Sequence, residues 1–454
     1  MFFKYTTCLF LFCYGLLNCL VIKAQLFEPV MVVNKDLKRK GKGYFFLVPH
    51  KMKKTIDHIA PKTGKQIIMN SDGEIIFYRY TKVGSDFKQH PNGIISYWSG
   101  RKFYLLDKSL TIIDSVGCVN GIRTDSHDFV ILPNGNYLLF GKERQLKDQI
   151  SKELRNHKKN KISKKASTLY DVVQELDKNK KLVFQWNSKD YFKAEDIEPF
   201  YLTDTAHVDV THFNSIDADA KGNILISARH FNEVLKIKRS DGSIIWRMGG
   251  KHNQIKVLND TIPFLGQHDA RFTGPNTFSL FDNGYYYDSL RHFARGLEYE
   301  IDDSTKTAKV IWSYSNSKPI TSISTGNLQK INKKLWLMNY GNMRSKVTNI
   351  TCELLNNKKQ AIRTLSFKDS LASYRTFFYS KLPFKLKQPV IKTAKNDSVI
   401  VLSTKQKYNY YLWSNGEQTP EIKTTLPQNF YVFVSNDGVS YTRSNVKKHT
   451  VKRK

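Results

Sequence analysis

The sequence predicts an all-β protein: a β-propeller of five or six blades followed by a small C-terminal Ig-like β-sandwich. From Tyr44 onward, polar turns containing Gly or Asn alternate with apolar, aromatic-rich runs, as in Ser71-Asp72-Gly73 before EIIFY. Such turns supply residues that adopt positive φ, and such runs form half-buried strands. The turn glycines Gly93 and Gly135 are separated by the roughly 40–45 residues that repeated four-stranded blades require. A hydrophobic fraction of 40% with 28 Phe and 24 Tyr is ample for a β-rich core.

Residues 1–24 have the pattern of an export signal. Lys4 gives the positive start, Leu9 to Val21 is the apolar stretch, and Ala24 precedes the expected cleavage point. The apolar run is short and adjoins the N-terminus, which argues against a spanning helix. Cys19 leaves a lipid-anchored form open. We therefore expect an exported protein without stable membrane insertion, located in the periplasm, at the cell surface or in the medium.

The propeller is expected to occupy residues 25–388, interrupted by a lysine-rich insert at about 142–168. We interpret the insert as a surface excursion with some helix. Beyond Pro383 the composition changes, and residues 389–446 hold the alternating runs SVIVLS, YNYYLW and FYVFVS between polar turns. This pattern predicts the Ig-like sandwich. Residues 447–454 form a basic tail.

The formal charge of +32 favours attraction to anions. No usual nucleic-acid recognition module is present in the sequence, so nucleic acid is not expected as a partner. A solvated basic surface and attraction to small anionic substrates both remain open. The spacing of Cys and His matches no zinc site, and neither a metal nor a cofactor is expected. Beyond the signal only Cys118 and Cys352 remain, and a disulfide between them is permitted but not implied.

Three histidines share one local pattern, because each stands just ahead of a β-type run that ends in a turn. They are His127 before FVILPNGNYLLF, His212 in THFNS, and His268 in GQHDAR. Equivalent positions on successive blades converge near a propeller's axis, so these histidines are expected to meet at one mouth of the channel, joined by Asn214 and Arg229. From the residues alone, purely structural histidines remain an alternative.

The segments SHDFVILPNGNYLLFG, THFNSIDADAKGNILISARHFNEVLKIKRSDGSIIWRMGG and GQHDARFTGPNTFSLFDNG occur in this order and resemble the bacterial arylsulfotransferase family. The resemblance covers roughly residues 40–385, and SYRTFF resembles the family's closing blade. It implies an exported propeller enzyme that works without the nucleotide donor of cytosolic sulfotransferases. A phenolic sulfate ester would donate its sulfuryl group to an active-site histidine, and a phenolic acceptor would then take it in a ping-pong mechanism.

Carried onto this sequence, the resemblance makes His268 the nucleophile that becomes a sulfohistidine. His127, His212, Asn214 and Arg229 match the residues that bind the sulfate oxygens and assist proton transfer. The chemistry of these side chains agrees: neutral imidazole is a competent nucleophile, a guanidinium and an amide are fixed donors, and imidazole exchanges protons near neutral pH.

Neighbouring residues are given supporting roles. His207 and Asp209 are placed beside the His212 motif, either in support or on the surface. Asp269 and Arg271 are expected to orient the His268 loop. Strand alternation predicts that His230 points away from the face of Arg229, and Asn283-Gly284 is interpreted as a turn.

The leading hypothesis is an aryl-sulfate sulfotransferase, possible as a homodimer. Two alternatives stay open: a non-catalytic ligand-binding propeller at the cell surface, and an aryl sulfatase-like hydrolase in which water accepts the sulfuryl group. The presence of all five site residues favours an enzyme, because a binding protein has no need for a histidine at position 268.

Overall fold

The computed structural model describes residues 30–33, 43–51, 64–81, 84–145, 166–198, 201, 207–284, 291, 293–344, 348–367, 371–396, 399–425 and 428–448. Within these ranges the regular structure is almost all β-strand, and the all-β prediction is confirmed. None of the helices in these ranges has the length and apolar character needed to cross a membrane. The expected export signal, residues 146–165 of the lysine-rich insert and residues 449–454 lie outside the described part.

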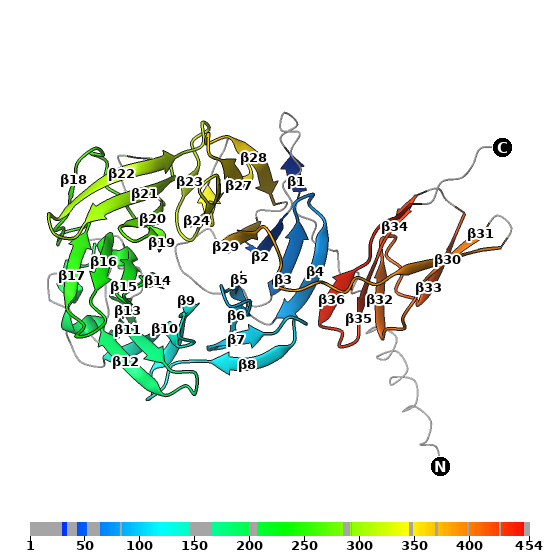
Figure 1. Ribbon diagram of the computed structural model, residues 1–454, viewed down its shortest axis with the longest axis horizontal. Helices are drawn as coiled ribbons and strands as arrows, with labels where there is room; N and C mark the ends of the chain where they lie inside the picture. Colours follow the sequence, from blue (N-terminus) through cyan, green and yellow to red (C-terminus); the bar gives the residue numbers. More distant parts are fainter. Residues whose placement is uncertain are drawn as a thin grey trace, which may run out of the picture.

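Six sheets of the described residues, in which nearly all strand pairs are antiparallel, surround a common centre (Figure 1). The first sheet contains β2 (Tyr44–Lys51), β3 (Gly64–Asn70), β4 (Ile75–Thr81) and β29 (Leu371–Tyr379). The second contains β5 (Ser85–Gln89), β6 (Ile95–Ser99), β7 (Lys102–Leu106) and β8 (Ile112–Val116). The third contains β9 (Arg123–Ile131), β10 (Tyr137–Gln145), β11 (Ser167–Leu176) and β12 (Leu182–Asn187) with β13 (His207–Asp209). Strands β10 and β11 thus extend into the stretch that the sequence assigned to the insert.

The other three sheets continue the same order. The fourth sheet contains β14 (Phe213–Ala218), β15 (Ile224–Ala228), β16 (Glu233–Ile237) and β17 (Ile244–Met248). The fifth contains β19 (His268–Gly274), β20 (Thr277–Asp282), β21 (Arg295–Asp302) and β22 (Thr307–Tyr314) with β18 (Lys256–Val257). The sixth contains β24 (Asn327–Asn332), β25 (Leu335–Asn339), β27 (Ile350–Asn356) and β28 (Ala361–Ser366) with β1 (Val30–Val33). A two-stranded sheet pairs β23 (Thr321–Ser322) with β26 (Met343–Arg344).

The innermost strands close the ring. In chain order β5, β9, β14, β19, β24 and β29 each contact the next, and β29 contacts β5 again. Strand β29, which contains SYRTFF, also pairs with β2 so that Tyr379 lies opposite Tyr44. Because β29 comes from the end of this region and β2 from its beginning, the first sheet joins the two ends of the ring.

The innermost strands are bulged where they approach the centre. Relative to the neighbouring strand, extra residues are inserted between Ser85 and Lys88 in β5, between Thr124 and Phe129 in β9, at Asn214 in β14, between His268 and Arg271 in β19, and between Ser373 and Thr376 in β29. A bulge breaks the strict alternation of side chains and redirects some of them. Most of the candidate site residues lie at these bulges or next to them.

Large aromatic side chains fill the space between neighbouring sheets. Trp186 packs in a core with Phe213, Trp246 with Phe278, and Trp336 stacks on Trp312 with ring centroids 4.3 Å apart. These buried contacts hold the sheets at fixed angles around the centre. The inner strands are therefore presented by a rigid frame.

The C-terminal part projects from one side of the ring (Figure 1). One of its sheets is built from β30 (Ile391–Asn396), β31 (Val399–Thr404) and β33 (Glu421–Thr424), and a short pair from β34 (Asn429–Phe430) and β37 (Lys447–Lys448). Its other strands, β32 (Tyr410–Trp413), β35 (Val432–Ser435) and β36 (Ser440–Arg443), extend the first ring sheet, because β36 pairs with β4. Trp413 and Phe430 lie in its core. The C-terminal part is thus hydrogen-bonded to the ring through a shared sheet.

Cys118 and Cys352 are both free thiols. Burial raises the pKa of Cys118 to about 12 and that of Cys352 well above its usual value. Both thiols therefore stay protonated at neutral pH, and the disulfide that the sequence left open does not form in this structure.

Candidate active site

His268 opens strand β19 and is almost completely buried, with 1% of its surface exposed. Its Nδ1 lies 2.8 Å from Asn283 Oδ1 and 3.0 Å from the carbonyl oxygen of Gly266, and both of these atoms accept hydrogen bonds. On the other side of the ring, the backbone N–H of Thr325 donates to Nε2 over 3.1 Å. The hydrogen of the imidazole therefore lies on Nδ1, and Nε2 carries the lone pair.

The charge state of His268 follows from its surroundings. Burial lowers its pKa well below the usual value, and the positive charge of Arg229 lowers it further. The imidazole is neutral at physiological pH. A neutral ring with its lone pair on Nε2 is the form that a nucleophile requires.

His127 and His212 lie against each other, with ring centroids 4.8 Å apart in an edge-on arrangement. His127 Nδ1 lies 2.5 Å from Asp125 Oδ1, and His212 Nδ1 lies 2.6 Å from Asp209 Oδ2. A carboxylate at Nδ1 holds the hydrogen on that nitrogen and fixes the orientation of the ring. In both residues Nε2 is therefore the nitrogen that exchanges a proton with a reacting group.

A largely buried lysine sets the charge around Asp209. Lys142 Nζ lies 2.6 Å from Asp209 and 2.9 Å from Asp171. Burial raises the pKa of Asp209, but the charge and hydrogen bond of Lys142, together with His230 and His127, outweigh burial and bring the pKa below its usual value. Burial raises the pKa of Asp171 to about 6. Lys142, which the sequence analysis counted in the surface insert, is in fact part of strand β10 and belongs to this buried network.

The prediction that His230 points away from the site is wrong. Strand β15 ends at Ala228, and Arg229–Phe231 forms the 3-10 turn η4, so strand alternation does not apply. The His230 ring stacks on His212 and on Tyr201, with both centroid distances 4.5 Å. Burial lowers the pKa of His230 to about 3, so this ring is neutral. It supports His212 by packing.

Arg229 and Asn214 complete the set that the sequence predicted. Arg229 is buried, donates from Nη2 to the carbonyl oxygen of Ile323 over 3.2 Å, and lies over the Tyr201 ring at 4.7 Å. Asn214 Nδ2 donates to the carbonyl oxygen of Gln267 over 2.7 Å and keeps its second hydrogen. Since Gln267 adjoins His268, the structure brings all five predicted residues into one region.

Six charged side chains, which we call the channel ion cluster, fill the centre of the ring beside this site. They are Asp86, Lys88, Asp128, Asp269, Arg271 and Arg375. Three positive and three negative charges balance one another, and all come from the innermost strands β5, β9, β19 and β29. The sequence analysis expected Asp269 and Arg271 to orient the His268 loop. In the structure they belong to this cluster.

Arg375 is the centre of the cluster and is completely buried. Its Nη1 lies 2.8 Å from Asp86, and its Nη2 donates to the carbonyl oxygen of Asn214 over 2.6 Å. It also donates to the carbonyl oxygen of His127 over 3.0 Å. One guanidinium thus fixes the backbone of two site residues from different sheets.

Sequence reasoning missed several residues of the site. Asn283 was interpreted as part of a turn, yet it is buried and bonded to His268, which corrects that interpretation. Asp125, two residues before His127, and Arg375, inside SYRTFF, were in view but unassigned. Of the two neighbours of His212, Asp209 contacts it, whereas His207 Nδ1 lies 2.9 Å from Ser167 Oγ. In the described part of the chain no group of His, Cys, Asp and Glu has an arrangement suited to a metal ion.

Comparison with known proteins identifies the family. The model of the arylsulfotransferase (ASST) family matches residues 30–381. The chain belongs to the arylsulfotransferase family. The arylsulfate sulfotransferase AssT of Escherichia coli O6:H1 is 23% identical to this chain over 313 residues, covering 52% of this chain and 49% of AssT. The chain therefore spans about half the length of this curated relative.

Two solved structures are distantly similar to this chain. A protein of unknown function from Bacteroides caccae has a TM-score of 0.45 at 10% identity, covering 74% of this chain and 98% of its own. The periplasmic gluconolactonase PpgL of Pseudomonas aeruginosa has a TM-score of 0.38 at 9% identity, covering 90% and 99%. At these scores neither likeness adds to the description of the fold. All five predicted site residues lie within the range that matches the family.

Proposed function

We propose that this protein transfers a sulfuryl group from a phenolic sulfate ester to a phenolic acceptor, by a ping-pong mechanism through a sulfohistidine at His268. The observation that carries the proposal is the state of His268. Its Nδ1 hydrogen is engaged by Asn283, its Nε2 carries the lone pair, and its ring is neutral beside the positive charge of Arg229.

In the first displacement, Nε2 of His268 attacks the sulfur atom of the donor. A nitrogen–sulfur bond forms, and the bond from sulfur to the phenolic oxygen breaks. The phenolate takes a proton from Nε2 of His127 or His212, and the histidine that gives it enters this step as the imidazolium and leaves it neutral, with its other hydrogen still on Nδ1. The sulfated imidazole gains positive charge, which Asn283 Oδ1 stabilises through the Nδ1 hydrogen. The Thr325 N–H, which lies 3.1 Å from Nε2, is well situated to pass to a sulfuryl oxygen as the new bond forms.

In the second displacement the acceptor phenol gives its proton to the same histidine pair. Its oxygen attacks the sulfur atom, the nitrogen–sulfur bond breaks, and His268 returns to the neutral form. A phenol has a pKa of about 10, so removal of its proton by a nearby base assists the attack. The pairing of His127 with Asp125 and of His212 with Asp209 supports this exchange, because it confines the proton transfer to Nε2.

The charge on the sulfuryl oxygens is the second requirement of the reaction. Arg229 carries a permanent positive charge in a buried position, where a charge interacts more strongly than in water. The remaining hydrogen of the Asn214 amide is a second donor. Removing one such donor typically costs about 2.7–4 kcal/mol of transition-state stabilisation.

We also propose that the protein is an exported β-propeller with a C-terminal Ig-like sandwich. The six sheets are the blades of a propeller, since their innermost strands contact one another around the full circle. The C-terminal sheets form the Ig-like sandwich of residues 389–446. Residues 1–24 direct export to the periplasm or the cell surface, and no metal or cofactor takes part.

Release of nitrophenolate from 4-nitrophenyl sulfate by the mature protein tests the proposal, with and without phenol and beside a His268→Asn variant. Phenol-dependent release that disappears in the variant is expected. Release that is independent of any acceptor would instead identify a hydrolase. A folded protein that releases no nitrophenolate with several phenols would contradict the proposal and favour a ligand-binding propeller.

A further inference from the structure

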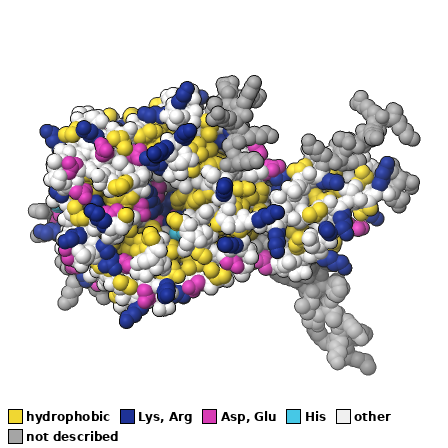
Figure 2. All heavy atoms as spheres, viewed as in Figure 1, with side chains coloured by type: hydrophobic (Ala, Val, Ile, Leu, Met, Phe, Trp, Pro, Cys, Tyr) yellow, Lys and Arg dark blue, Asp and Glu magenta, His cyan; other side chains and the backbone are white. Residues whose placement is uncertain are grey.

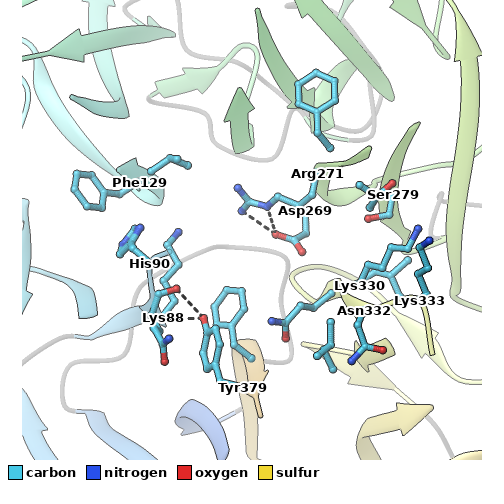
Figure 3. A pocket seen from close by; sticks show the side chains of 18 residues that line it. Lys88, His90, Phe129, Asp269, Arg271, Ser279, Lys330, Asn332, Lys333 and Tyr379 are labelled. Carbon is cyan, nitrogen blue, oxygen red and sulfur yellow. Dashed lines mark hydrogen bonds and ion pairs between the residues drawn. The ribbon is translucent and has the colours of Figure 1, made fainter. Parts of the chain in front are cut away.

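A pocket of about 540 Å³ lies at the end of the central channel opposite to His268. The innermost strands run in the same direction through the ring. Strand β19 begins at His268 and lines the pocket from Asp269 to Thr273. Strand β29 passes from Tyr374, beside His127, to Phe377 and Tyr379 in the pocket. Figure 2 shows this face of the molecule hollowed at the centre of the ring, and Figure 3 shows the lining side chains.

The channel ion cluster separates this pocket from the candidate active site. Lys88, Asp269 and Arg271 form its pocket side, while Arg375 and Asp128 lie behind them with fully buried side chains. None of the histidines at 127, 212 and 268 lines the pocket. A molecule bound there has no access to the Nε2 atoms that the proposed reaction uses.

The charged side chains of the pocket are mainly positive. Lys88, Arg271, Lys330 and Lys333 line it, with Asp269 as the one carboxylate among the described lining residues. Asp269 is engaged by Arg271 and by Arg375. The carboxylates that pair with Lys88 and Lys330 (Asp86, Asp128 and Glu298) are not part of the lining, so these lysines are held from the wall behind them. The lining therefore offers more hydrogen-bond donors for an anion than competing negative charge.

One buried hydroxyl in the lining lacks a hydrogen bond. Ser279 is completely buried, and its Oγ has no partner among the described residues. A buried polar atom without a partner costs free energy, which a ligand oxygen can recover. Ser279 lies on the same side of the pocket as Lys330 and Lys333 (Figure 3).

Much of the remaining wall is apolar, and four of its side chains are aromatic. Phe129, Phe272, Phe377 and Tyr379 line the pocket together with Leu328. Aromatic walls favour flat rings, and the volume is within the range of ordinary small-molecule sites. The combination of flat apolar walls with lysines and a spare hydroxyl on one side fits a ring that carries one anionic group.

We propose that this pocket is a second, non-catalytic binding site for a small aromatic anion, that is, an aromatic ring bearing a carboxylate, sulfonate or sulfate. The ring lies against the aromatic side chains, and the anionic group meets Lys330, Lys333 and Ser279. This inference does not depend on the proposed sulfuryl transfer, because it uses none of the residues of that reaction.

Binding of benzenesulfonate to the full chain, measured by titration calorimetry, tests the inference. Benzenesulfonate is suitable because its sulfur is bonded to carbon and offers no phenolate to leave. The double variant Lys330→Gln/Lys333→Gln is expected to weaken binding on the order of tenfold or more, and Ser279→Ala several-fold. Lys309→Gln, which removes an exposed lysine from the outer strand β22, is the matched control and is expected to have no effect.

Two further arms locate the site and define the ligand. Arg229→Gln, which alters the opposite end of the channel, is expected to leave this binding event intact. Absence of saturable binding, or binding that Arg229→Gln removes and the lysine double variant leaves unchanged, would overturn the inference. Inorganic sulfate that binds as tightly as benzenesulfonate would overturn the assignment of an aromatic ligand.

Discussion

Asn283 Oδ1 accepts the Nδ1 hydrogen of His268 over 2.8 Å, and this contact determines which nitrogen of the imidazole can react. The side-chain amide of Asn283 cannot exchange the positions of its oxygen and nitrogen by a half-turn flip, because its nitrogen donates to Ser322 Oγ and to the carbonyl oxygen of Thr325. The oxygen must therefore face the imidazole. A buried amide thus selects the tautomer that leaves the lone pair on Nε2.

Substitution of Asn283 tests this relationship. In Asn283→Leu the Nδ1 hydrogen keeps only the more distant carbonyl oxygen of Gly266, and the charge of the sulfated ring loses its stabilising oxygen. We expect kcat/KM for sulfuryl transfer to fall about tenfold, the equivalent of about 1.4 kcal/mol. The control is Asn276→Leu, at an exposed position in the turn between β19 and β20. Equal activity of the two variants would contradict the role of Asn283.

Asp125→Asn tests the orientation of His127. An amide at this position can donate to Nδ1, which moves the imidazole hydrogen to Nε2 and removes its capacity as a base. By analogy with the same change in a serine-protease triad, kcat is expected to fall by about 10²–10⁴-fold with a smaller effect on KM. Asp241→Asn, at an exposed turn, serves as the control. A kcat within twofold of the wild type would exclude His127 from proton transfer.

The channel ion cluster is expected to contribute to the free energy of unfolding. Arg375→Met leaves two positive and three negative charges in a buried cluster, and removal of one partner of a buried ion pair typically costs about 3–5 kcal/mol. Lys238→Met removes an exposed pair with Asp241 and is expected to have a much smaller effect. Urea-induced unfolding of the two variants measures the difference. Similar losses in both would show that the cluster is not a stabilising element.

The buried, neutral His230 is expected to make the free energy of unfolding depend on pH. Its pKa is about 3 in the folded chain, against an ordinary value of about 6.5 in the unfolded chain. Between about pH 6.5 and pH 3 the unfolded state therefore binds a proton that the folded state does not, and the free energy of unfolding falls as pH falls. The contribution is up to about 1.4 kcal/mol per pH unit. Above pH 6.5 it is absent.

His230→Phe keeps a ring that can stack on His212 and cannot titrate. Urea unfolding between pH 7.5 and 4.5 is therefore expected to show a shallower loss of stability in this variant than in the wild type. The comparison uses the slope against pH, because the variant also loses the hydrogen bond to the Asp209 carbonyl oxygen. Identical slopes would mean that His230 is protonated in the folded protein.

The sequence was informative about the site because its strongest signals are local. His127, His212 and His268 each precede a strand, and five predicted residues do lie in one region. Asn283 was not predictable in this way, since it contacts His268 only through the pairing of β20 with β19 and resembles a common turn residue. Arg375 contacts Asp86 across most of the chain, and a contact at such separation leaves no local pattern.

The fold was predictable to the level of its repeated strands and turns. Strand alternation failed at His230, because η4 replaces the end of the expected strand. It was also insufficient at the bulges of the innermost strands, where extra residues redirect side chains. The lysine-rich stretch was misjudged at Lys142, since a buried lysine with two carboxylate partners has the same sequence appearance as a solvated one.

Direct detection of the covalent intermediate tests the central claim. Rapid mixing of the protein with 4-nitrophenyl sulfate in the absence of any acceptor is expected to release a burst of one nitrophenolate per site. Mass spectrometry of the quenched protein is expected to find one added sulfuryl group on the peptide that contains His268, and added phenol is expected to remove it. Phenol-dependent turnover without a burst, or a sulfuryl group on a different residue, would contradict the account.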